Sequence, residues 1–132
     1  MKHDDPGVLA ECKKDGWNMQ IISQPPNSPD FNILDLGFFN SIQSIQYKEN
    51  PQTIDELIAS VEDAYWSEPI YTTDFIFLTL MQTMEQTMLA KGKNNYKLQH
   101  MGKERLLRSG ELPRTIRCSD EAIEAALEVI SE

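Results

Sequence analysis

Only one segment of the chain, residues 17–23, alternates apolar and polar side chains in the way that is typical of a β-strand. The other apolar residues recur mostly at helical spacing. A lone strand leaves its backbone N–H and C=O groups without partners. We therefore predict a mainly helical α/β fragment with one strand and four or five helices. Either the strand pairs outside this chain, or the chain is a piece of a larger α/β domain.

Start and stop signals place the helices. Asp followed by Pro is a typical N-cap with proline in the first turn, and Thr-x-x-Glu is a capping box. The expected helices begin at Asp5-Pro6, near Asn32, at Thr53-Ile54-Asp55-Glu56, near Asp74 (running to about Lys91) and at Ser119. Residues 93–118 carry no clear pattern.

Length and composition exclude several classes of protein. The 132 residues suffice for one ordinary domain, and 40% apolar with 25% charged residues is not the composition of a disordered chain. We expect no membrane association, because no run of about 18 apolar residues occurs. The first residues lack the apolar stretch of a secretory signal, and Cys12 and Cys118 suggest neither a disulfide scaffold nor a zinc site. An intracellular protein is expected.

The net charge of −9 is unevenly distributed. Residues 91–117 hold eight basic and two acidic side chains, a net of +6, whereas residues 1–90 and 118–132 carry −10 and −5. Any contact with a polyanion should concentrate in this basic stretch. The candidate nucleic-acid contacts are Lys91, Lys93, Lys97, Lys103, Arg105 and Arg108.

A proline-rich loop precedes the most distinctive acidic residue. Three prolines within residues 24–32 stiffen the loop, and Asp35 follows in the first turn of an expected helix. Two interpretations are open. Asp35 is either a carboxylate presented by a rigid turn, or a residue that is favoured there by helix capping and the helix dipole. Asp4 and Asp5 precede a helix, and capping explains them more simply than a catalytic role.

The amino-acid sequence that contains this loop and Asp35 resembles that of a known protein family. Residues 25–39 read Pro-Pro-Asn-Ser-Pro-Asp-Phe-Asn-Ile-Leu-Asp-Leu-Gly-Phe-Phe. They closely resemble the block around the last catalytic acid of mariner-type DNA transposases, and especially its plant mariner-like branch. Four further segments resemble the tail of such transposases, namely residues 42–46, 53–57, 76–80 and 92–97. The resemblance therefore covers roughly residues 4–113.

The resemblance implies a ribonuclease H-like fold, in which three carboxylates hold two Mg²⁺ ions that cleave phosphodiester bonds. Asp35 matches the third acid of that set, and Asp30 matches an aspartate that looks structural in the family pattern. The family's second acid lies upstream in a Gln-Asp-Asn-Ala block, which this sequence does not contain. One carboxylate cannot hold two cations against their mutual repulsion. We therefore expect Asp35 to be the only residue of this chain that corresponds to a catalytic, metal-ligating acid of the family. We expect that this chain binds no Mg²⁺ and has no nuclease activity.

Residues 1–113 are thus interpreted as a partial ribonuclease H-like catalytic domain with a helical tail, and residues 114–132 as an acidic C-terminal helix. The first hypothesis is a truncated mariner-like transposase, derived from an enzyme that cleaves and transfers transposon ends in the nucleus. The alternative is a non-catalytic module that binds a partner protein or, weakly, nucleic acid. A decayed transposon without a selected role is the third possibility. Association with a second copy of the chain stays open.

Overall fold

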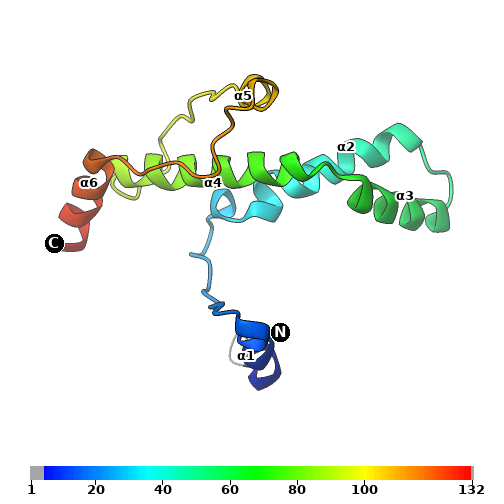
Figure 1. The fold of residues 1–132 in the computed structure, drawn as a ribbon, viewed down its shortest axis with the longest axis horizontal. Helices are drawn as coiled ribbons and strands as arrows, with labels where there is room; N and C mark the ends of the chain where they lie inside the picture. Colours follow the sequence, from blue (N-terminus) through cyan, green and yellow to red (C-terminus); the bar gives the residue numbers. More distant parts are fainter. Residues whose placement is uncertain (1–4, 132) are drawn as a thin grey trace.

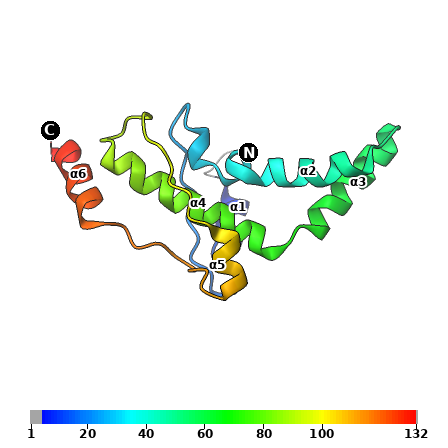
Figure 2. The same cartoon turned by 90° about the horizontal axis from the view of Figure 1, so that it is seen from above.

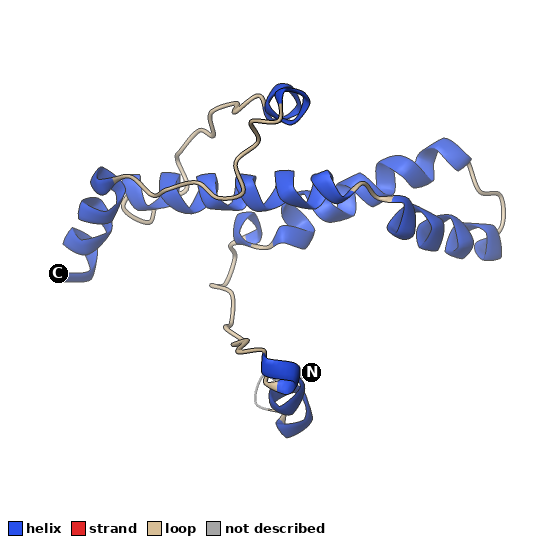
Figure 3. Cartoon of the chain, viewed as in Figure 1, coloured by secondary structure: helices blue, strands red, loops and turns tan. Residues whose placement is uncertain are grey.

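The structure, a computed structural model, describes residues 5–131. These residues form six α-helices and three short turns of other helical types, with no strand among them (Figure 3). The α-helices are α1 (Pro6–Glu11), α2 (Phe39–Glu49), α3 (Ile54–Ser67), α4 (Ile70–Leu89), α5 (Lys103–Ser109) and α6 (Asp120–Ser131). The short turns are the 3₁₀ turns η1 (Lys14–Gly16) and η2 (Pro29–Phe31), and the π-helix η3 (Leu34–Phe38). The prediction of a mainly helical chain is confirmed.

The predicted strand over residues 17–23 is wrong for the described chain. The segment is extended, but the described residues contain no second strand that could pair with it. Within it, the Met19 N–H donates to the Cys12 carbonyl at 3.1 Å. Trp17 and Ile22 remain exposed. The alternation of apolar and polar side chains thus favours an extended backbone here. A β-ladder also requires a second strand that pairs with the first.

α4 is the central element, and the other helices are arranged along it (Figures 1 and 2). η2 and η3 pack on α4, α6 packs near its C-terminal end, and α2 and α3 form a helical hairpin beyond its N-terminal end. Ile76, Leu78 and Thr83 of α4 are buried. At 100° per residue, Leu78 lies across the helix from Ile76 and Thr83, so α4 is covered on two sides.

Local capping explains where several helices begin. In α3 the Thr53 hydroxyl accepts from the Glu56 N–H at 3.2 Å, and the Glu56 carboxylate accepts from the Thr53 N–H at 3.2 Å, as the capping box predicts. The Asp5 carboxylate caps α1 by accepting from the Gly7 N–H at 2.8 Å. Asp4 lies outside the described residues. α4 starts at Ile70, directly after Pro69, rather than near Asp74.

Few apolar side chains of the described residues are fully buried. The buried apolar residues are Ala64, Ile76, Leu78 and Ala122, whereas Trp66, Ile70 and Ile130 are each more than 80% exposed. The accessible surface is 10610 Å². A compact monomer of this mass exposes about 7,100 Å². The described helices therefore form an open arrangement around α4, with α1 set apart at the end of an extended arm (Figure 1).

Candidate functional site

Asp35 lies in the π-helix η3, in the first turn after the proline-rich loop. Its Oδ2 accepts from the Asn32 side-chain amide at 2.9 Å, and the Asn32 Oδ1 accepts from the Leu34 N–H at 3.1 Å. Asn32 therefore joins the start of the helix to the carboxylate of Asp35. The carboxylate itself is exposed. The side chain that accepts a hydrogen bond from a backbone N–H of this turn is that of Asn32, and the Asp35 carboxylate is held by Asn32 in its turn.

Close packing holds this turn in place. A Cβ atom added to Gly37 would lie 3.0 Å from the Ile76 Cγ1, so the absence of a side chain lets η3 approach α4. Phe38 packs edge-to-face on Tyr65 of α3, with ring centroids 6.0 Å apart. π-helical turns are rare and frequently occur at functional sites. The turn that carries Asp35 is thus fixed from two directions.

Asp30 has a different environment. Its Oδ2 accepts a hydrogen bond from the Tyr96 hydroxyl at 3.1 Å. This contact links the proline-rich loop to a segment 66 residues later in the chain. A role in holding the loop agrees with the structural interpretation that the resemblance implies for Asp30.

The described residues do not provide the ligands of a two-metal site. Among residues 5–131 there is no group of three or more His, Cys, Asp or Glu side chains that could hold a metal ion. Asp35 contributes one exposed carboxylate, and its neighbour Asn32 already uses both side-chain polar atoms. Two hard cations need several oxygen ligands. The Mg²⁺ pair of the family that the sequence resembles therefore does not fit the described site.

The six candidate nucleic-acid contacts do not form one patch. Lys91 pairs with Glu128 of α6 at 2.5 Å. Lys103 turns toward α4: its Nζ donates to the Phe75 carbonyl at 2.7 Å and to the Thr79 hydroxyl. Partial burial of the ammonium group lowers the pKa of Lys103. Lys93 and Lys97 are exposed in the loop after α4.

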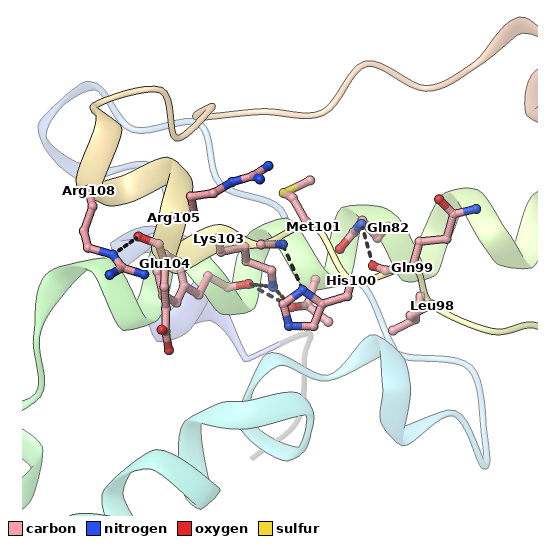
Figure 4. A pocket seen from close by; sticks show the side chains of 12 residues that line it. Gln82, Leu98, Gln99, His100, Met101, Lys103, Glu104, Arg105 and Arg108 are labelled. Atoms are coloured by element: carbon pink, nitrogen blue, oxygen red, sulfur yellow. Dashed lines mark hydrogen bonds between the residues drawn. The ribbon is translucent and has the colours of Figure 1, made fainter.

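Arg105 and Arg108 both line a pocket that the sequence did not indicate, and their side chains leave α5 in different directions (Figure 4). The pocket has a volume of about 560 Å³ and lies between α4, residues 98–102 and α5. His100 also lines it and belongs to residues 93–118, for which the sequence pattern predicts no regular element. The pocket depends on a contact between residues 28 apart, Lys103 and Phe75, which no local pattern reveals.

A second, smaller cavity explains the row of methionines in α4. Met81, Met84 and Met88 line a space of about 200 Å³ together with Ile116 and Cys118. Methionine fills irregular apolar gaps well because its side chain is unbranched and flexible. These residues therefore connect α4 to the segment that leads into α6.

Within residues 5–131, no helix combines the length and the apolar character needed to cross a bilayer. Comparisons with protein-family models, with curated proteins and with solved structures find no match for this chain.

Proposed function

We propose that this chain is a part of a mariner-like DNA transposase that is inactive alone, contributing the segment of the third catalytic acid and the helical tail of a ribonuclease H-like domain. The proposal combines the resemblance of residues 25–39 with the way Asp35 is held. A carboxylate that acts with partners on another chain must be positioned accurately. The Asn32 amide, the Gly37–Ile76 contact and the Phe38–Tyr65 contact provide such positioning.

The observation that carries the proposal is the uncovered apolar surface. The accessible surface of 10610 Å² is about 1.5 times the 7,100 Å² or so expected of a compact chain of this mass. Exposed apolar side chains on this scale favour association with another protein surface. The extended residues 17–23 also offer backbone groups that a sheet edge could pair. A missing sheet of the parent domain satisfies both features.

A second candidate function is weak, sequence-independent nucleic-acid binding. Residues 91–117 carry a local net charge of +6, and Lys93, Lys97 and Arg105 are exposed. The acidic flanks oppose the approach of phosphates, so dissociation constants in the non-specific range of about 10⁻⁴ to 10⁻⁶ M are expected. Such binding should fade steeply as salt rises. Nanomolar binding that survives neutral substitution of the six candidate residues would contradict this candidate.

The decisive experiment tests complementation. The full chain is mixed with the N-terminal part of a mariner-like transposase that supplies the first two acids, and cleavage of the matching transposon end is measured with Mg²⁺. We expect no cleavage by the chain alone and cleavage by the mixture. Asp35→Asn should abolish it. Asp30→Asn is the matched control, because an asparagine oxygen can still accept from the Tyr96 hydroxyl. Failure of the two parts to associate would overturn the proposal.

Metal binding provides an independent check. Titration calorimetry of the chain with Mg²⁺ or Mn²⁺ should reveal no submicromolar site, since Asp35 belongs to no group of three or more potential ligands among the described residues. A submicromolar site lost in Asp35→Asn would show that the chain builds a metal centre alone. The proposal also implies action in the nucleus, on DNA at transposon ends, with association between copies as one way to cover the apolar surface.

A further inference from the structure

Helix α3 buries its small side chains and exposes its large apolar ones. Its buried residues, Ser60 and Ala64, lie about one turn apart on the side that packs against α2. The large apolar residues are between 38% and 76% exposed, and we call them the α3 stripe: Ile54, Leu57, Ile58, Val61 and Tyr65. In a surface helix the broad apolar face normally packs on the core. The described chain therefore leaves the main apolar face of α3 without cover.

The α3 stripe has the layout of a face on which another helix can pack. At about 100° per residue, its members lie within about 60° of Ile54 around the helix axis, and they extend for about 17 Å. Apolar residues that recur every third or fourth position let one helix pack along another. Trp66 adjoins the stripe: it is 82% exposed and packs edge-to-face on Tyr65, with ring centroids 5.0 Å apart. Tyrosine and tryptophan are among the residues that most often carry the binding energy of protein interfaces.

The charged side chains around this stripe are all negative. Residues 49–90 contain eight Asp or Glu residues and no Lys, Arg or His. Asp55 and Glu62 lie about 80–100° around α3 from Ile54, along the edge of the stripe opposite to Ser60 and Ala64. Within residues 5–131, neither carboxylate forms an ion pair or a side-chain hydrogen bond. The stripe therefore has one edge closed by α2 and one edge that attracts positive charge.

Charge and position select among the possible occupants of the stripe. A second copy of α3 would bring two sets of carboxylates together, and like charges across an interface are unfavourable. A sheet that pairs with residues 17–23 would meet another part of the chain, because the α2–α3 hairpin lies at one end of the molecule, away from that segment (Figures 1 and 2).

We propose that the α3 stripe binds an amphipathic helix of a partner protein, and that the polar flank of this partner helix is basic. The apolar residues of the partner helix pack on the stripe and beside Trp66, and its lysine or arginine side chains pair with Asp55 and Glu62. This proposal stands on α3 alone and does not depend on the proposed function.

The test compares two synthetic peptides that differ only in charge. Each is an amphipathic helix of about 18 residues with leucine at helical spacing, and its polar flank carries lysine in one peptide and glutamate in the other. Binding to the full chain is measured by fluorescence anisotropy. We expect a dissociation constant below about 100 μM for the lysine peptide and at least tenfold weaker binding of the glutamate peptide. Binding of the lysine peptide should weaken but persist at about 0.5 M salt, because the apolar contact is not screened. Equal binding of the two peptides, or complete loss in salt, would overturn the proposal.

Matched variants locate the binding face. Ile58→Gln removes an exposed member of the stripe and should weaken binding of the lysine peptide about fivefold or more, as expected for the loss of a packed apolar side chain. Ile130→Gln makes the same exchange on α6, the other acidic helix with exposed apolar residues, and should change binding less than about twofold. Glutamine is a good helix former, and circular dichroism checks that both variants keep their helices. Equal losses in the two variants would refute the assignment to α3.

Sedimentation equilibrium of the full chain tests the competing occupant. A dimer that is lost in Ile58→Gln would assign the stripe to a second copy and overturn the proposal, whereas a monomer that binds the lysine peptide supports it. No other part of a transposase is present in these measurements. Failure of the complementation experiment therefore leaves this inference standing, and failure of peptide binding leaves the proposed function standing.

Discussion

Gly37 sets the distance between the turn that carries Asp35 and the central helix. The site of its absent Cβ lies 3.0 Å from the Ile76 Cγ1, which is tighter than ordinary van der Waals contact. Ile76 is only 7% exposed and cannot easily move aside. The absence of a side chain at Gly37 therefore determines how closely η3 packs on α4.

Substituting Gly37 with alanine should lower the free energy of unfolding by about 1–3 kcal/mol, as for other overpacked sites. Alanine's better helix propensity offsets up to about 1 kcal/mol of this cost. Urea denaturation of Gly37→Ala, Ile76→Ala and the double variant measures the coupling. The two substitutions should be less destabilising together than the sum of their separate effects. Unchanged stability of Gly37→Ala would show that the contact is not tight.

Lys103 is a second residue whose role is defined by one contact. Its ammonium group bonds to the Phe75 carbonyl and the Thr79 hydroxyl, and lies 6.0 Å from the Phe75 ring centroid. It therefore holds α5 against α4. Because α5 forms one wall of the pocket, the same contact holds that wall in place.

We predict that Lys103→Ala speeds hydrogen exchange of the α5 amides. The expected loss is about 1 kcal/mol of local protection, below the usual value for bonds to a charged group because the side chain is half-buried. Arg105→Ala is the control, since it changes the same helix without touching α4. Burial lowers the folded-state pKa of Lys103 below its ordinary value of 10.5, so this residue's contribution should make the protein more stable as pH rises toward 10.5. Equal exchange in both variants would contradict the role of Lys103.

At the scale of elements, two carboxylates attach α6 to α4. The Glu85 Oε1 accepts from the Ser119 N–H at 2.9 Å, and the Ser119 hydroxyl accepts from the Ala122 N–H at 3.3 Å and caps α6. Hydrogen bonds from Ser119 lower the pKa of Glu85, and the hydrogen bond and charge of Lys91 lower the pKa of Glu128. The attachment of the acidic helix therefore depends on these groups being ionised.

A folded-state pKa below the ordinary 4.5 means that the stabilisation is complete above pH 4.5 and is lost as pH falls through the lowered values. We predict that the amide resonances of α6 shift toward random-coil positions over that acidic range. The double variant Glu85→Gln/Glu128→Gln should remove most of this pH dependence. Glu124→Gln changes an exposed carboxylate of the same helix and should leave it intact. A transition that persists in the double variant would place the titrating group elsewhere.

At the scale of the whole molecule, the open arrangement limits how cooperatively the chain can unfold. The buried apolar residues Ala64, Ile76, Leu78 and Ala122 are a small core for 132 residues. Large side chains on α3, α4 and α6 face solvent, among them Trp66 and Ile130. The stability of the helices should therefore depend on what covers these side chains.

Calorimetry should reveal a broad unfolding transition for the isolated chain. A compact domain of this length absorbs about 90 kcal/mol near 60 °C. This chain should absorb roughly three-quarters of that, because its accessible surface of 10610 Å² leaves about 11,300 Å² buried on folding, against about 14,800 Å² for a compact chain of the same mass. The complementing part of a transposase should sharpen the transition and raise its midpoint through binding to the folded state. A sharp transition of full enthalpy in the isolated chain would contradict the open arrangement.

Short-range signals in the chain are enough to predict most of the helices. The Asp5 cap, the Thr53–Glu56 capping box and the start of α6 after Ser119 all depend on hydrogen bonds that span three residues or fewer. Such bonds form wherever the local backbone is helical, so the sequence reports them directly. The acidic and basic segments can be recognised in the same way.

The features that sequence reasoning missed depend on distant partners. Residues 17–23 alternate like a strand, but the described chain offers no second strand to complete the ladder. α5 lies in a segment without clear periodicity, and its position depends on the contact from Lys103 to Phe75. The pocket forms only because α4 and α5 meet there. Packing between segments far apart in sequence decides these features, since each one exists only when both partners are in place.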